Sequence, residues 1–144
     1  MLRKVLTIAT VATTLGFASL PAMAGGISIQ QFGAWNQAGG AQAGWNNSIG
    51  VFQNGVLNTG VANQFGNNNT AAIGQDGFNN YGETWQNGNH NAAGVGQFGA
   101  NHTAVVSQDG NGNVAAGVQV GNGCNAGVTQ AGAGNVAAFV QTCP

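Results

Sequence analysis

Polar and apolar positions alternate along the chain in rows of eleven residues. Each row begins with a glutamine, numbered here as position zero: Gln31, Gln42, Gln53, Gln64, Gln75, Gln86, Gln97, Gln108, Gln119, Gln130 and Gln141. Position seven is mostly alanine, and position nine is mostly β-branched or small. Positions five, seven, nine and eleven, the last being the next glutamine, are all odd. In an extended chain their side chains therefore lie on the same face. The alternation predicts a strand of roughly seven residues in every row.

The strands are separated by a recurring turn signal. Glycine occupies position two of the first ten rows: Gly33, Gly44, Gly55, Gly66, Gly77, Gly88, Gly99, Gly110, Gly121 and Gly132. Asparagine occupies position five in eight of them: Asn36, Asn47, Asn58, Asn69, Asn80, Asn91, Asn113 and Asn135. His102 and Cys124 take that place in the other two rows. Glycine followed by two variable residues and closed by asparagine is typical of a turn, so we predict turns at these positions.

The odd period determines how the strands are arranged. Residues eleven apart in an unbroken strand point to opposite faces, so every glutamine faces inward only if the chain reverses at each turn. We therefore expect an all-β solenoid with two strands, and hence two rows, in each rung, stacked in register and in parallel at roughly 4.8 Å. A helical interpretation is excluded, because a glycine in every row costs a helix about 1 kcal/mol each. A three-sided coil with three rows per rung stays open, since Phe32, Phe65 and Phe98 recur in every third row.

Stacking in register explains why buried positions carry amides. The glutamines form two ladders, in which each side chain donates to one neighbouring rung and accepts from the other, and we expect the turn asparagines to do the same. Small residues let the two sheets approach closely, and larger aliphatic and aromatic ones complete the core: Ala38, Ala71, Ala93, Ala104, Ala115, Ala126, Ala137, Val51, Ile73, Val95, Val106, Val128 and Phe139.

Composition and charge change this picture at the N-terminus. Arg3 and Lys4, the only basic residues, precede an apolar stretch from Val5 to about Leu20 and the small-x-small pattern of residues 22–24. We predict a cleaved secretory signal peptide over residues 1–24, a short segment over 25–30 and the repeats over 31–144. The side-chain charge then changes from −1 to −3. Without Lys or Arg the repeats are not suited to bind nucleic acid.

Export to an oxidising compartment allows the two cysteines to pair. Cys124 and Cys143 stand at turn positions one rung apart, and we predict a disulfide between them that fastens the last rung. His90 and His102 lack partners at metal-ligand spacing, so we interpret both as solvated turn residues. The residues suggest no catalytic, metal or cofactor site and no small-molecule substrate.

The outward positions carry the acids and several aromatic side chains. Asp76, Glu83 and Asp109 all have outward parity. We predict that Asp76 and Asp109 act as gatekeepers, which slow association of the chain before export. The outward aromatics, among them Phe32, Phe65 and Trp85, have two open interpretations: they mark lateral association of fibres, or they pack only against neighbours on their own sheet face.

The rows resemble the curlin repeat of bacterial curli subunits, Gln-x-Gly-x-x-Asn-x-Ala-x-x-x-Gln. Matching text includes QNGNHNAAGVGQ, QDGNGNVAAGVQVG and QAGAGNVAAFVQ, and the similarity covers residues 31 to 141. Departures from the family pattern are the two cysteines and the shortness of the segment before the first repeat. The nucleator subunit of the family is basic in its last repeats, whereas this chain has no basic residue after Lys4, which favours the major subunit.

The resemblance implies a secreted structural subunit, exported through the periplasm, that assembles on the cell surface. Its partners would be further copies of itself in a homopolymer fibre, a nucleator subunit and an outer-membrane secretion machinery. The fibre would be a functional amyloid of the biofilm matrix that serves surface adhesion. The alternatives are the nucleator or minor subunit, and a monomeric ligand- or ice-binding β-solenoid.

Overall fold

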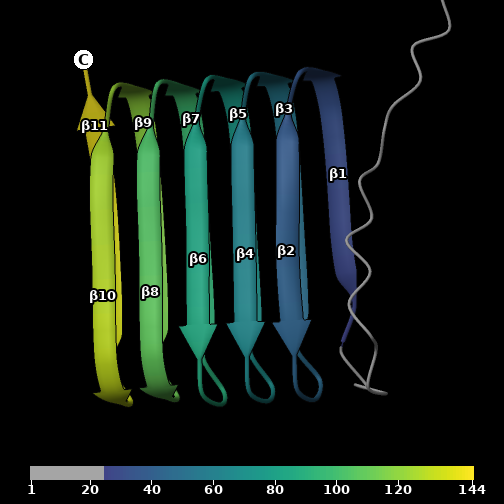
Figure 1. The fold of residues 1–144 in the computed structure, drawn as a ribbon. Coiled ribbons are helices and arrows are strands. Elements are labelled where there is room, and N and C mark those ends of the chain that lie inside the picture. The colour runs from purple at the N-terminus through teal and green to yellow at the C-terminus, as the bar shows by residue number, and fades with distance from the viewer. Residues whose placement is uncertain (1–24) are drawn as a thin grey trace, which may run out of the picture.

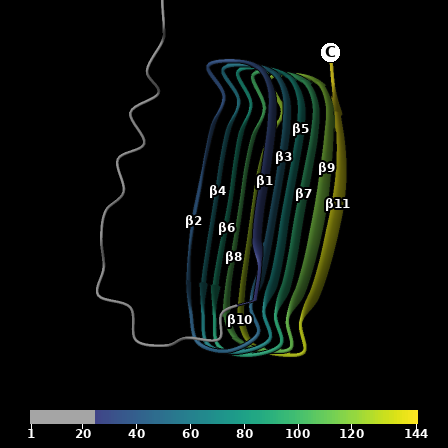
Figure 2. The same ribbon diagram turned by 90° about the vertical axis from the view of Figure 1, so that its right-hand side faces the viewer.

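Eleven β-strands alternate between two facing sheets in the described part of the chain. The structure, a computed structural model, describes residues 25–144. The strands are β1 (Ile27–Ala34), β2 (Gln37–Ala43), β3 (Ser48–Val56), β4 (Thr59–Phe65), β5 (Thr70–Phe78), β6 (Tyr81–Asn87), β7 (Ala92–Ala100), β8 (Thr103–Asn111), β9 (Val114–Asn122), β10 (Asn125–Ala133) and β11 (Val136–Cys143). The chain passes from one sheet to the other after each strand and winds a flattened solenoid (Figures 1 and 2).

The sheets are parallel and in register. The odd-numbered strands form a six-stranded sheet in the order β1-β3-β5-β7-β9-β11, and the even-numbered strands form a five-stranded sheet in the order β10-β8-β6-β4-β2. Gln53, for example, pairs with Gln31 on one side and Gln75 on the other. Each strand thus pairs with strands two rows away in the sequence, which confirms the predicted two-stranded rung. The alternative of three rows per rung is wrong.

Eight of the eleven strands are longer than the predicted seven residues, because most glycines at position two belong to a strand and not to a turn. Seven of these ten glycines lie within a strand, and only Gly44, Gly66 and Gly88 lie in bends. Their φ angles run from 100° at Gly132 to 138° at Gly77. The reversal itself occurs at position four, where the backbone is left-handed in every turn: Trp35, Asn46, Leu57, Asn68, Asn79, His90, Asn101, Gly112, Gly123 and Gly134.

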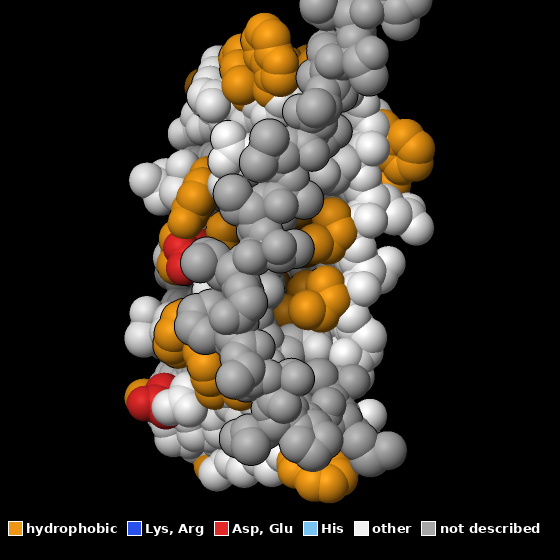
Figure 3. All heavy atoms as spheres, turned by 45° about the vertical axis from the view of Figure 1, so that its right-hand side comes forward, with side chains coloured by type: hydrophobic (Ala, Val, Ile, Leu, Met, Phe, Trp, Pro, Cys, Tyr) orange, Lys and Arg blue, Asp and Glu red, His pale blue; other side chains and the backbone are white. Residues whose placement is uncertain are grey.

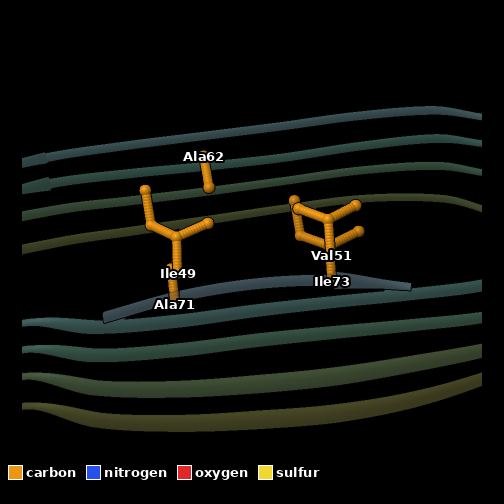
Figure 4. Close-up of a cluster of buried hydrophobic side chains, with 5 residues drawn as sticks. All are labelled: Ile49, Val51, Ala62, Ala71 and Ile73. Carbon is orange, nitrogen blue, oxygen red and sulfur yellow. The ribbon is translucent and has the colours of Figure 1, made fainter. Parts of the chain in front are cut away.

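The apolar core lies between the sheets in two small clusters. Figure 4 shows the first, in which Ile49, Val51, Ala71 and Ile73 of one sheet point toward the sheet that carries Ala62. Ala93, Val95, Ala104, Val106 and Ala115 form the second. Between them, β6 places Gly82 and Thr84 at positions seven and nine. The outermost strands bury less: Ala38, Ala126, Val128, Ala137 and Phe139, all predicted for the core, are only half-buried.

The predicted signal peptide, residues 1–24, lies outside the described residues. In residues 25–144 there is no helix with the length and apolar character needed to cross a membrane.

Amide ladders and open sheet edges

The glutamines point inward and form one continuous hydrogen-bonded ladder in each sheet. Those from Gln53 to Gln119 are at most 1 % exposed. In every step Nε2 of one glutamine donates to Oε1 of the glutamine two rows later, as in Gln53 to Gln75 at 2.7 Å and Gln64 to Gln86 at 2.7 Å. Each ladder therefore has a direction: its first glutamine presents a free acceptor and its last a free donor.

A second hydrogen bond ties each ladder to the opposite sheet. The remaining hydrogen on Nε2 is donated to a backbone carbonyl at the start of the preceding strand, as from Gln53 to Gln37 at 2.8 Å and from Gln86 to Thr70 at 3.0 Å. Both donors of a buried amide are thus satisfied, which removes the cost of burying it. The contact also holds the two sheets together across the core.

The turn asparagines form ladders of a different kind from the one predicted. Asn58 shows the pattern: its backbone N–H donates to Oδ1 of Asn36 at 3.0 Å, and its Nδ2 donates to the carbonyl of Gly77 at 3.0 Å. The asparagine side chain therefore bonds mainly to backbone groups of the adjacent rungs. Amide-to-amide contacts between position-five asparagines do occur, as from Asn80 to Asn58 at 3.0 Å, but they supplement the backbone bonds.

The glycines at position two are required by the close approach of successive rungs. A Cβ on Gly77 would overlap the backbone carbonyl of Gly99 in the next rung, and the same overlap recurs at the other interior glycines of this position. The positive φ adds backbone strain for any other residue. A Cβ at the position-four glycines Gly112, Gly123 and Gly134 would meet no such overlap, which is consistent with bulky residues such as Trp35 and Leu57 at this position despite their left-handed backbone.

His102 corrects one sequence-based prediction. We expected a solvated turn residue, but its side chain is 1 % exposed. It stands in the asparagine ladder, where its Nδ1 accepts from the backbone N–H of Cys124 at 3.1 Å. Its Nε2 lies 3.2 Å from the carbonyl of Phe98 and donates to it in the same tautomer. Its place at position five was the signal that predicts this burial, whatever the residue type. His90, at position four, is exposed as expected.

A disulfide joins Cys124, in the turn between β9 and β10, to Cys143 of β11, with a Cα–Cα distance of 5.6 Å. The two cysteines are separated by 19 positions in the sequence. In the other rungs, the same separation is that of the hydrogen bond from asparagine Nδ2 to a glycine carbonyl, as from Asn80 to Gly99 at 3.0 Å. The covalent bond thus replaces a hydrogen bond at the equivalent place in the terminal rung.

On the face seen in Figure 3, two separate acidic groups and several patches of hydrophobic side chains lie on the surface. Asp76 accepts from Nδ2 of Asn54 at 3.0 Å, and Asp109 accepts from Nδ2 of Asn87 at 3.0 Å. Tyr81 donates to Glu83 at 2.7 Å, and this hydrogen bond, with smaller effects of burial and of the Glu83 charge, raises the pKa of Tyr81.

Two pairs of aromatic rings pack against each other on their own sheet face. Phe32 lies against Phe52 with ring centroids 5.9 Å apart, and Phe65 lies against Trp85 at 5.0 Å. Trp35 and Trp45, in turns, are strongly exposed at 78 % and 60 %. No group of three His, Cys, Asp or Glu side chains within residues 25–144 is arranged to hold a metal ion.

Among residues 25–144, each of the four outermost strands has one edge that pairs with no other strand. These are β1 and β2 at the N-terminal end and β10 and β11 at the C-terminal end. None of the four contains a charged residue or a proline, the usual means by which natural sheets block an open edge. All three acids lie instead on the inner strands β5, β6 and β8.

Comparison with known families agrees with this geometry. The model of the curlin associated repeat matches residues 44–77 and 78–110. The chain belongs to the curlin-repeat family. Among curated proteins, no sequence matches this curlin-repeat chain. The family is one of structural fibre subunits and not of enzymes, so the ladders and open edges are the features of this curlin-repeat solenoid that bear on function.

Proposed function

We propose that this protein is the major subunit of an extracellular functional amyloid fibre, which grows by templated addition of strands at the open ends of the solenoid. The observation that carries the proposal is the pair of polar, in-register ladders that end at uncharged, proline-free edges. An incoming chain with the same rows continues the backbone pairing and both ladders without any change of register. The inward amides favour a copy of the same sequence, because a mismatched residue leaves them unpaired.

The surroundings of the fibre follow from the same proposal. Residues 1–24 direct export through the periplasm, an outer-membrane secretion machinery passes the chain to the surface, and a nucleator subunit starts polymerisation. The fibre contributes to the biofilm matrix and to surface adhesion. The absence of Lys and Arg from residues 25–144 supports the role of major subunit, since the family's nucleator is basic in its last repeats.

A monomeric binding solenoid is the second candidate, but the outer faces do not support it. Such a protein needs a regular array of one residue type along one face. Position ten of the six-stranded sheet instead carries Gln30, Phe52, Gly74, Gly96, Val118 and Val140. A succession of this kind offers no repeated ligand contact.

The test is assembly of the purified mature chain, residues 25–144, at neutral pH. We expect fibres that bind an amyloid dye after a lag, that lose the lag when fibre fragments are added, and that diffract at roughly 4.8 Å along the fibre axis. A chain that stays folded and monomeric at high concentration, with or without fragments, overturns the proposal.

The gatekeeper role of Asp76 and Asp109 is a separate prediction. Each carboxylate adds charge to a face that is otherwise almost neutral, so we expect Asp76→Ala and Asp109→Ala each to shorten the lag of dye-monitored assembly. Asn54→Ala is the control, because it removes the hydrogen bond to Asp76 but keeps the charge. An unchanged lag in both aspartate variants contradicts the prediction.

A further inference from the structure

The number of strands in residues 25–144 is odd, and this determines how one copy of this region fits onto the next. Because strands alternate between the sheets, β1 and β11 both lie in the six-stranded sheet, and the five-stranded sheet ends one strand earlier, at β10. A second copy added in the same orientation places its β1 on β11. Its β2 then faces β10 across a gap that one strand would fill. A copy rotated by a half-turn about the fibre axis places β1 on β10 and β2 on β11, and the winding continues without a gap.

We propose that successive copies in the fibre are related by this half-turn, so that each sheet of the fibre is built alternately from the odd-numbered and the even-numbered strands of successive molecules. The proposal rests on the assembly proposed above and specifies the interface. Rotation is compatible with the fold because every row has the same inward positions, so either sheet offers the same glutamine ladder to an incoming strand.

Gln42, on the outer edge of β2, supplies the first independent observation. Its Oε1 is buried and has no hydrogen-bond partner, although its Nε2 donates to Gln64 at 3.1 Å. In the rest of the ladder, Oε1 accepts from the glutamine of the preceding strand in the same sheet. After a half-turn, Gln141 on β11 of the preceding copy occupies that place, and its Nε2 has one hydrogen not used within the chain. In the unrotated arrangement the nearest strand is two spacings away, and Gln42 Oε1 stays unpaired.

Phe139, on β11, supplies the second observation. It stands at core position nine, and its ring fills the space that a Cβ on Gly117 would occupy in the adjacent strand. We expect a small neighbour on the other side of the ring to accommodate it better than a large one. The half-turn brings Gly40 of β2 to that place, because Gly40 is at position nine of its row. The unrotated arrangement brings Ile29 of β1 there instead.

The first strand also finds complementary partners after the half-turn. Ile27 and Ile29 occupy the inward positions seven and nine of β1, yet they are 48 % and 42 % exposed. In the half-turn register they lie beside Ala126 and Val128 of β10 in the preceding copy. This contact covers apolar surface that the single molecule leaves in water, which favours association.

Cross-linking of assembled fibres distinguishes the two arrangements. The outward, exposed Gln30 of β1 lies at position ten, and in the half-turn register its neighbour in the preceding copy is Thr129 of β10. In the unrotated register its neighbour is Val140 of β11. The matched pair of variants is therefore Thr129→Cys/Gln30→Cys and Val140→Cys/Gln30→Cys. Within one molecule the two introduced cysteines stand at opposite ends of the solenoid, so any bond between them joins two copies.

After mild oxidation we expect at least about tenfold more covalent multimer from the Thr129→Cys/Gln30→Cys fibres, because only there does the spacing of paired strands, about 4.8 Å, fall within disulfide range. Three outcomes overturn the half-turn but leave fibre assembly intact: more multimer from the Val140→Cys/Gln30→Cys fibres, equal amounts from both pairs, or no multimer from either pair although fibres form. Failure of the unmodified chain to form fibres refutes assembly itself.

Electron cryomicroscopy of unmodified fibres tests the half-turn even if the cysteine variants do not assemble. A half-turn gives an axial step of roughly 26 Å per molecule, from 5.5 strand spacings, whereas the unrotated arrangement gives roughly 29 Å from six. A step near the larger value, without rotation, overturns the half-turn.

Discussion

Replacing Gln86 with glutamate tests the ladder with a change of a single group. Gln86 has no exposed surface; its Nε2 donates to Gln108 Oε1 at 2.9 Å and to the carbonyl of Thr70 at 3.0 Å, and its Oε1 accepts from Gln64. A carboxylate at this position can still accept the hydrogen bond from Gln64. It has no hydrogen to donate, so its contacts with Gln108 Oε1 and the Thr70 carbonyl become contacts between two oxygen acceptors. A protonated carboxyl group restores one of them.

The penalty follows from the protonation state. Protonating a carboxyl group of ordinary pKa, about 4.3, at pH 7 costs about 3.7 kcal/mol. One lost hydrogen bond adds about 1 kcal/mol, which gives a total of about 5 kcal/mol at pH 7 and about 1 kcal/mol at pH 3. Burial raises the pKa of the new carboxyl group in the fibre, so the stability of the variant fibre is present below the pKa of the free chain and is lost as the pH rises.

The assay is the concentration of soluble chain in equilibrium with fibres, in enough denaturant to keep the free chain unfolded. For Gln86→Glu it should rise several thousand-fold at pH 7 and about fivefold at pH 3, relative to the unmodified protein. Gln37→Glu is the matched control, because Gln37 is exposed at the start of β2 and the change in net charge is the same. The control should shift by less than about twofold. A Gln86→Glu variant that behaves like the control at pH 7, or that shows no pH dependence, refutes the ladder as a source of stability.

Three further substitutions test other parts of the rung. Gly77→Ala should destabilise the fibre by more than about 3 kcal/mol in denaturant-induced dissociation, because its Cβ overlaps the Gly99 carbonyl at a φ of 138°; Gly74→Ala, with open space around it, should have little effect. Thr84→Val should stabilise the fibre by about 1–2 kcal/mol, since the buried Thr84 hydroxyl has no partner, whereas Thr103→Val on the outer face should not. Cys124→Ser should destabilise the fibre by about 2–4 kcal/mol, because the disulfide is lost. The double change Cys124→Asn/Cys143→Gly should recover about 1 kcal/mol of this by restoring the hydrogen bond found in the other rungs. Equal stability of the single and double variants would contradict the equivalence of the disulfide and that hydrogen bond.

The period of the glutamines was sufficient to predict the rung, because it states a physical requirement. An inward amide every eleven residues forces a reversal in each row, because residues eleven apart in an unbroken strand point to opposite faces. The recurrence of Phe32, Phe65 and Phe98 in every third row carried no such requirement. The structure places Phe32 and Phe98 in one sheet and Phe65 in the other, so these rings never stack as a ladder. Outward residues vary freely and therefore contain little information about register.

Residues that depart from the repeat were harder to predict. His102 was interpreted as a solvated turn residue because it lacks partners at metal-ligand spacing, whereas its position in the row determines its burial. The left-handed backbone at position four was also missed, although seven of the ten residues there are Asn or Gly, the residue types that best tolerate this conformation. The unpartnered atoms of Gln42 and Thr84 could not be foreseen, because they depend on which groups happen to lie within reach in three dimensions.

The direction of the ladders links the stability of one molecule to the specificity of assembly. A buried acceptor without a donor, such as Gln42 Oε1, costs about 1–3 kcal/mol, so the isolated solenoid is destabilised at its N-terminal end, which contacts the preceding copy in the fibre. Only a strand whose glutamine presents Nε2 in the same register removes this cost. A reversed copy would bring acceptor against acceptor at one junction and donor against donor at the next. The ladders therefore favour growth in one orientation, and the odd number of strands requires each new copy to be turned so that both ladders continue.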